Sequence, residues 1–364
     1  MNLEGALAIA LGLLLDAAMG DPRWNLHPVR ILGSLAAKAE GAALVLSRRV
    51  ISRCGPSRCG LGRPGEPAPA VSQLPELTAP SGPRVPRLVR AGALAWLAVC
   101  CISAGAALGF VFLARALHPA AAVMAEALVV WASIAPSDLA RHAYRVARGL
   151  DRDRRACRAE PEEGRRAVAM IVGRKVEALD YSGVSRACVE SVAESSVDGA
   201  AAPLFWAALF GPWAAFLYRA VNTMDSMFGH KDARYYSFGL VAARADDVAN
   251  WLPARISAIV ACLAAPLAGG SAGGALRSFL RYRNRHASPN AGQPESAYAG
   301  AFGLRLGGPV LYAEGLIDKP WMNPSGRDAE AADIRRAVRL MAVQTVLSAA
   351  VFAAAAAALR TFIG

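Results

Sequence analysis

The chain has 364 residues, of which 55% are hydrophobic, and its mean hydropathy is +0.31. This composition is too apolar for an ordinary soluble globular domain and is typical of a membrane protein. The net charge of +12 comes from 36 arginines and 4 lysines set against 28 acidic residues. Because basic residues concentrate in cytoplasmic loops, and because the sequence has no recognisable nucleic-acid-binding module, we expect no nucleic-acid partner.

Several segments have the length and apolarity of membrane-spanning helices, since about twenty apolar residues cross a bilayer core. The candidates are residues 3–19, 91–114, 116–137, 199–218, 256–276 and 340–359. We therefore predict an all-α, polytopic integral membrane protein with five to eight membrane segments and a cytoplasmic helical region.

The first polar segment follows the apolar helix 3–19 and runs from Gly20 to Arg30. Two prolines and a glycine make it a rigid, non-helical turn. It holds Asp21, His27 and Arg30 within ten residues, which indicates part of a site. The alternative is an interfacial loop anchored by Trp24.

The chain divides into five predicted segments. The linker 48–90 holds eight arginines, and eight prolines lie between residues 56 and 86, so we expect it to be flexible. Asp138–Leu150 has the pattern of an amphipathic helix, with Leu139, Ala143, Val146 and Leu150 on one face. The segments are 1–47 (membrane helices and polar loop), 48–90 (linker), 91–136 (transmembrane hairpin), 137–255 (cytoplasmic helical region and catalytic core) and 256–364 (membrane helices and loop).

The stretch after residue 190 carries most of the chemistry. Glu190, Glu194 and Asp198 stand at i, i+4 and i+8, a spacing that stacks three carboxylates on one helix face. Like charges so arranged need a partner. The uncharged run 199–218 then either crosses the membrane fully or is a broken or re-entrant helix that turns back at Gly211-Pro212.

The residue inventory suits phosphate chemistry. The sequence has no Gly-x-x-x-x-Gly-Lys-Ser/Thr loop, no His-Glu-x-x-His motif and no Gly-x-Ser-x-Gly motif. It has seven carboxylates between Glu190 and Asp247, interleaved with lysine and arginine. Magnesium binds one or two carboxylates plus phosphate oxygens, and arginine clamps phosphates and carboxylates. A proton-coupled transporter would display similar residues.

Ordered motifs extend over nearly the whole chain. They are Gly20-Asp21-Pro22, His27-Pro28-Val29-Arg30, Gly173-Arg174, Glu190-Ser-Val-Ala-Glu194 with Asp198-Gly199, Asn222-Thr-Met-Asp225-Ser, Asp246-Asp247 with Asn250 and Arg255, and Ser288-Pro289-Asn290. Together they resemble the CobD/CbiB family of adenosylcobinamide-phosphate synthases. Members of that family are integral membrane proteins. The resemblance implies ATP-dependent amide ligation of aminopropanol, or its O-phosphate, to the corrinoid adenosylcobyric acid.

On this basis we predict a site at the cytoplasmic side of the inner membrane that uses ATP and Mg²⁺. The expected catalytic residues are Glu190, Glu194, Asp198, Asp225, Asp246 and Asp247, of which Glu190, Glu194, Asp198 and Asp225 are magnesium candidates. The expected substrate- or phosphate-binding residues are Asp21, His27, Arg30, Arg174, Asn222, Lys231, Arg244, Asn250, Arg255, Ser288 and Asn290.

Other interpretations stay open at this point. One alternative is a structural role, in which any of the predicted carboxylates pairs with arginine in a buried network. The alternative functions are a transporter for a corrinoid or other anionic solute and a membrane Mg²⁺-dependent phosphotransferase. The expected partners are the corrinoid, aminopropanol phosphate and membrane lipid, with other membrane-bound enzymes of nucleotide-loop assembly and an oligomer as further candidates.

Overall fold

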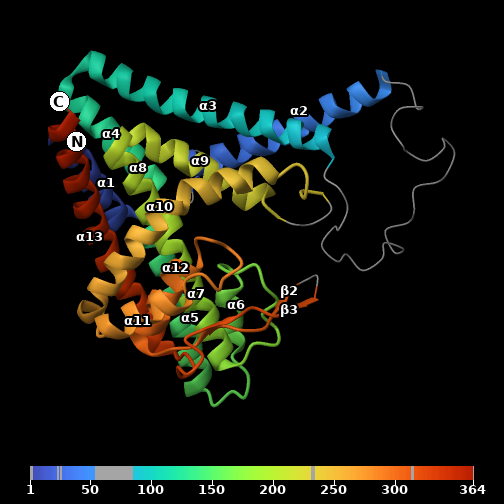
Figure 1. Ribbon diagram of the computed structural model, residues 1–364, viewed down its shortest axis with the longest axis vertical. Helices are drawn as coiled ribbons and strands as arrows, with labels where there is room; N and C mark the ends of the chain where they lie inside the picture. The colour runs from blue at the N-terminus through green and yellow to red at the C-terminus, as the bar shows by residue number, and fades with distance from the viewer. Residues whose placement is uncertain are drawn as a thin grey trace. The chain divides into compact units, whose positions relative to one another are not determined.

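The computed structural model describes residues 3–22, 24, 27–53, 85–230, 234–312 and 315–363. These residues form helices almost throughout, as predicted, with four short strands (Figure 1). The chain forms two compact units. Unit 1 comprises Met1–Arg23, Ala107–Tyr218 and Asp247–Gly364, and unit 2 comprises Trp24–Ala106 and Arg219–Asp246.

Unit 1 contains most of the helices and all four strands. Its elements are α1 (Leu3–Met19), α4 (Pro119–Ser133), α5 (Pro136–Arg155), α6 (Glu162–Val168), α7 (Tyr181–Ser196), α8 (Ala202–Phe210), α11 (Ala272–Tyr282), α12 (Gly292–Phe302), α13 (Ala331–Ile363), β1 (Leu306–Gly307), β2 (Val310–Tyr312), β3 (Gly315–Ile317) and β4 (Trp321–Met322). The strands pair antiparallel as β1 with β4 and β2 with β3. Three more helices belong to both units: α3 (Pro86–Leu117), α9 (Pro212–Phe228) and α10 (Leu240–Ala264).

The largest apolar core of unit 1 joins α5, α7, α12 and α13. The predicted amphipathic helix is confirmed, because Ala143, Val146 and Leu150 on α5 are all buried in this core. Small side chains let the neighbouring helices α11 and α12 approach closely. A β-carbon added at Gly274 of α11 would stand 2.6 Å from the carbonyl oxygen of Gly300 on α12.

Unit 2 packs α2 (Pro28–Arg53) against parts of α3 and α9. Leu32, Ala95 and Phe228 are buried in its core. The predicted boundaries of the linker 48–90 are wrong, because α2 runs on to Arg53 and α3 already begins at Pro86. The rest of that predicted linker, residues 54–84, lies outside the described residues.

Four helical segments of the described chain are long and apolar enough to cross a membrane: Pro86–Leu117, Pro119–Arg155, Leu240–Ala268 and Ala331–Phe362. This agrees with a polytopic membrane protein, although five to eight segments were expected. Two of the expected membrane segments, residues 3–19 and 199–218, are not among these four. The helix α1 has only 17 residues, and the uncharged run 199–218 is interrupted.

The predicted break at Gly211-Pro212 is present, whereas whether residues 199–218 cross the membrane or turn back stays a prediction. The helix α8 ends at Gly211, whose φ of 99° is favourable only for glycine, and Pro212 begins α9. A second irregularity precedes α8, since residues Val197–Ala201 form a π-helical turn. The carbonyl oxygen of Gly199 in this turn accepts a hydrogen bond from the N–H of Ala135, over 2.9 Å, between α4 and α5.

Candidate functional site

Unit 1 contains a buried ion pair between two predicted site residues. The turn after α6 presents Arg174, whose Nη2 donates to Oε2 of Glu190 on α7 over 2.6 Å. The other carboxylate oxygen of Glu190 accepts a hydrogen bond from the backbone N–H of Gly307, also over 2.6 Å. The two side chains are only 10% and 5% exposed, so protein groups rather than water compensate most of their charge.

The N–H of Gly307 reaches Glu190 because of its local backbone. Gly307 pairs with Trp321 in the β1–β4 ladder and has a φ of 82°. A β-carbon at this position would lie 2.5 Å from the carbonyl oxygen of Pro320, so the position requires glycine. Trp321 also lies under the guanidinium of Arg186, 4.9 Å from its ring centroid, and Arg186 in turn stands 3.9 Å from Glu190.

A second pair of titratable residues, His286 and Glu295, lies near the same charges. Glu295 at the start of α12 is 5% exposed. Burial raises its pKa well above the usual range, and the negative charges of Glu190 and Glu194 raise it further. Burial also lowers the pKa of His286, assisted by Lys319. His286 Nε2 and Glu295 Oε1 are 4.0 Å apart, and both pKa shifts favour a neutral imidazole beside a protonated carboxyl group.

Replacing Glu295 with Gln should raise the melting temperature of the protein at neutral and mildly alkaline pH. Because burial raises the pKa of Glu295 above its usual value of 4.5, the native state binds more protons than the unfolded chain between these two pKa values. The contribution of Glu295 to the free energy of unfolding therefore falls as the pH rises from 4.5 through the raised native pKa of this side chain. Thermal unfolding in detergent from about pH 5 to about pH 8 measures the effect.

The matched control for this pH experiment is Glu177→Gln, which removes a carboxyl group from an exposed position. Glu177→Gln should keep the pH dependence of the original protein, whereas Glu295→Gln should flatten it. Equal pH profiles for the original protein and Glu295→Gln would contradict a proton on Glu295.

Three further predicted residues contact Asn290, which is itself a predicted site residue. Its side-chain amide donates to the carbonyl oxygen of Asp247 over 2.9 Å, and its Oδ1 lies 3.5 Å from Nη1 of Arg255. Ser288 Oγ accepts from the N–H groups of Asn290 and Ala291, both over 3.3 Å. The helix α12 begins at Gly292, a short turn after Ser288. The segment 286–295 thus joins the Glu295 pair to α10.

The carboxylate stripe holds only in part. Glu190 and Glu194 lie one turn apart on α7, whereas Asp198 lies in the π-helical turn, where the regular α spacing ends. Their surroundings differ too: Glu190 is buried, Asp198 is half-buried and Glu194 is exposed. Within the described parts of the chain, no group of three or more His, Cys, Asp or Glu side chains is arranged to hold a metal ion. Magnesium binding therefore stays a prediction that would depend on phosphate or water oxygens.

The remaining predicted residues are divided between the two units. Asp21 and Asn250 lie in unit 1, where Asn250 accepts a 2.8 Å hydrogen bond from Tyr218. In unit 2, Asn222 donates to Asp246 over 3.2 Å. His27, Arg30, Asp225 and Arg244 also belong to unit 2, and Lys231 lies outside the described residues. A single acidic site that combines Glu190, Glu194 and Asp198 with Asp225 and Asp246 stays a prediction.

Sequence reasoning assigned no role to several residues around Glu190 and Glu295. These are Arg186, His286, Glu295, Gly307 and Lys319. Two of them, His286 and Glu295, are the first and last residues of the polar segment that contains Ser288 and Asn290. That segment was the sequence signal that could have identified them. The Gly307 contact joins positions 117 residues apart through a backbone N–H, for which a single sequence offers no pattern.

The fold and these contacts define a polytopic helical membrane protein with a buried site of carboxylates, arginine and histidine. The family model described as CobD/Cbib protein matches residues 9–341. The chain therefore belongs to the CobD/CbiB family, as its motifs predicted.

Full-length relatives support this membership. The cobalamin biosynthesis protein CobD of Klebsiella pneumoniae is 38% identical over 346 residues, which cover 95% of this chain and 96% of the relative. The cobalamin biosynthesis protein CbiB of Salmonella choleraesuis is 37% identical over 350 residues, covering 96% and 97%. The CobD of Clostridium perfringens is 31% identical over 341 residues, covering 94% and 95%. No solved structure matches the chain.

Proposed function

We propose that this protein is an ATP-dependent acid–amine ligase of cobalamin biosynthesis. It would join aminopropanol, or its O-phosphate, to the free carboxylate of adenosylcobyric acid and release adenosylcobinamide or its phosphate. Membership of the CobD/CbiB family over residues 9–341 carries the proposal. The buried pair of Arg174 and Glu190 supports it, because phosphoryl and acyl transfer need fixed cationic groups in a site shielded from water.

The proposed reaction has two steps. A carboxylate is a poor electrophile, so the carboxylate oxygen first attacks the γ-phosphorus of ATP, which forms an acyl phosphate and releases ADP. The amine nitrogen then attacks the carbonyl carbon, the C–O bond to phosphate breaks, and the nitrogen loses a proton as the amide forms. Magnesium would neutralise phosphate charge when bound.

The residues of unit 1 suit separate tasks in this scheme. Both carboxylate oxygens of Glu190 are already hydrogen-bonded, so we assign it to hold Arg174 in place. Arg174 and Arg255 would bind phosphate or carboxylate groups through their paired N–H donors. Glu194 and Asp198, the less buried carboxylates, would be the magnesium ligands of this unit. His286, kept neutral by its surroundings, is the proposed acceptor of the amine proton.

The other predicted residues keep their proposed roles in unit 2. His27, Arg30, Asn222 and Arg244 are proposed substrate-binding residues, and Asp225 and Asp246 are proposed metal or base residues. Since ATP is supplied from the cytoplasm, we place the nucleotide-binding side of the site there, in the inner membrane. Twelve lysines and arginines between Arg141 and Arg186 agree with that orientation.

A vesicle assay tests the reaction and its side together. Sealed inside-out vesicles that contain the protein should convert external ATP to ADP only when adenosylcobyric acid and aminopropanol phosphate are both present. Right-side-out vesicles should stay inactive until they are permeabilised. ATP hydrolysis that ignores the amine would contradict ligation. Accumulation of unchanged corrinoid inside the vesicles would instead support the transporter.

A further inference from the structure

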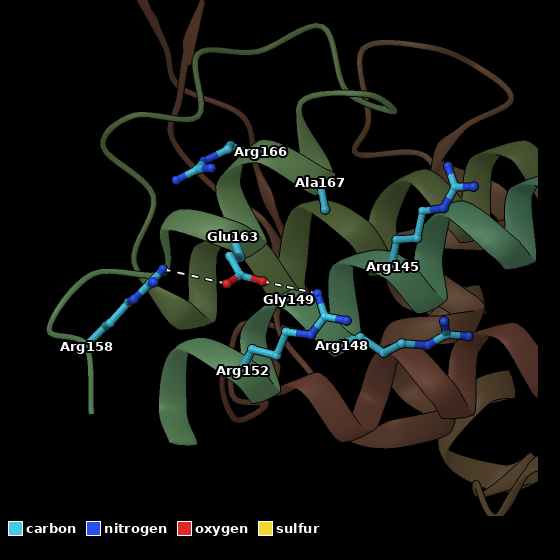
Figure 2. A pocket seen from close by; sticks show the side chains of 8 residues that line it. All are labelled: Arg145, Arg148, Gly149, Arg152, Arg158, Glu163, Arg166 and Ala167. Carbon is cyan, nitrogen blue, oxygen red and sulfur yellow. Dashed lines mark hydrogen bonds and ion pairs between the residues drawn. The ribbon is translucent and has the colours of Figure 1, made fainter. Parts of the chain in front are cut away.

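Unit 1 contains a second charged region that shares no lining residue with the candidate site. It is a pocket of about 460 Å³, formed by α5, α6 and the loop that joins them (Figure 2). The lining residues are Arg145, Arg148, Gly149, Arg152, Arg158, Glu163, Arg166 and Ala167. Its volume lies in the range of small-molecule pockets, roughly 300–1,000 Å³, and its lining holds five arginines against one acid.

Buried contacts fix the walls of this pocket. Asp153 of α5 is fully buried and accepts hydrogen bonds from the backbone N–H groups of Glu163, over 2.9 Å, and Gly164, over 3.0 Å. It also accepts a 3.0 Å bond from Arg158. At Gly149 an added β-carbon would stand 2.9 Å from the carbonyl carbon of Glu163, so the backbones of α5 and α6 nearly touch. The pocket is therefore formed before any ligand arrives.

The arginines of α5 form a row along one face of the helix. Arg145, Arg148 and Arg152 stand at i, i+3 and i+7, which places them on the same side over a rise of about 10 Å. This row is longer than one phosphate group and suits a ligand that carries several. Like charges at such spacings repel each other and destabilise the helix, a penalty that a bound anion removes.

Acidic side chains compensate only one end of the row. Glu163 lies between Arg152 and Arg158, with N–O distances of 3.4 and 3.8 Å, and Figure 2 shows both contacts. Arg145 and Arg148 are exposed, and neither has an ion pair or side-chain hydrogen bond to any residue that the structure describes. Two guanidinium groups thus remain available beside a preformed pocket.

We infer that this pocket binds an anion with at least two phosphate groups. Guanidinium groups bind phosphate oxygens through paired N–H donors, and a fixed row of them favours linked phosphates over a single one. Loop charge that only orients a membrane protein needs neither a pocket nor a buried aspartate that shapes it. The chemistry fits a soluble polyphosphate, including the triphosphate of a nucleotide, and equally the headgroup of a lipid with two phosphates. The inference is independent of the ligase reaction, because binding requires no turnover.

The test uses the full-length protein in nanodiscs of phosphatidylcholine. Binding of inorganic triphosphate, ATP and orthophosphate is measured by calorimetry for the original protein and for Arg145→Gln/Arg148→Gln. The control, Arg155→Gln/Arg339→Gln, removes the same charge from two exposed positions outside the pocket. A second set of nanodiscs contains cardiolipin, whose headgroup carries two phosphates. The melting temperature without ligand shows whether each variant is folded.

We expect triphosphate to bind the original protein and the control with the same affinity. The Arg145→Gln/Arg148→Gln variant should bind triphosphate about tenfold or more weakly, because it has lost charge-assisted hydrogen bonds. Orthophosphate should bind weakly to all three proteins. If triphosphate binds weakly but cardiolipin raises the melting temperature of the original protein more than that of the variant, the ligand is a lipid headgroup and the inference stands. The inference is overturned if the original protein and a folded Arg145→Gln/Arg148→Gln variant bind triphosphate with the same affinity and also respond equally to cardiolipin. Arg145→Lys/Arg148→Lys, with charge but no paired donors, should bind at an intermediate strength.

Discussion

Replacing Arg174 with Met should abolish ligase turnover and destabilise the protein by about 3–5 kcal/mol, the usual cost of leaving one partner of a buried ion pair alone. The expected loss is large because the Arg174 and Glu190 side chains are 10% and 5% exposed, so little water reaches the remaining carboxylate. The N–H of Gly307 would still donate to Glu190, and Arg186, 3.9 Å from it, would be the nearest cationic group with a known distance. Thermal unfolding in detergent and the vesicle assay measure the two effects.

Two further variants separate the stability effect from the catalytic one. Arg174→Met/Glu190→Gln removes both charges, so it should recover part of the lost melting temperature without recovering turnover. The adjacent Lys175 is exposed, so Lys175→Met should change stability by less than about 0.5 kcal/mol. The proposed role of Arg174 fails if Arg174→Met behaves like Lys175→Met in both measurements.

Replacing Gly300 with Leu should prevent α12 from packing on α11. A β-carbon at Gly300 would overlap the backbone carbonyl group of Gly274 and the side chain of Ser278, and backbone cannot move aside as a flexible side chain can. Overpacking of a core commonly costs about 1–3 kcal/mol, and we expect the upper end or complete loss of folded protein. The measurement is the melting temperature, together with the yield of monodisperse protein.

The control for this packing prediction is Gly273→Leu, on the neighbouring helix α11. No atom lies within 4 Å of a β-carbon at Gly273, and leucine is a better helix former than glycine. This variant should keep the original melting temperature or slightly exceed it. Similar losses in Gly300→Leu and Gly273→Leu would contradict the close approach of the two helices.

Features that depend on local sequence were predicted well. The amphipathic pattern around Val146 specified the buried face of α5, and Gly211-Pro212 marked the break after α8. Each of these signals lies within a few neighbouring residues, where periodicity and backbone preferences act directly. The ordered motifs predicted the family because they extend over nearly the whole chain.

Features that depend on contacts distant in sequence were missed. The strands have only two or three residues, too few for an alternating pattern to be recognised. The proton on Glu295 depends on its burial among groups from other elements, a property of the packed chain. The arginines around Gly149 were interpreted only as cytoplasmic charge, because a pocket requires the approach of α6, which the sequence does not reveal.

The π-helical turn at Val197–Ala201 has a consequence for the phase of the two helices that flank it. Such a turn contains one residue more than an α-helical turn, so the side chains of α8 are rotated by about 100° from where an uninterrupted α7 would have put them. Deleting one residue here would preserve helical hydrogen bonding yet turn the buried face of α8 away from its neighbours. Insertions and deletions at this point should therefore be tolerated far less well than substitutions of similar size.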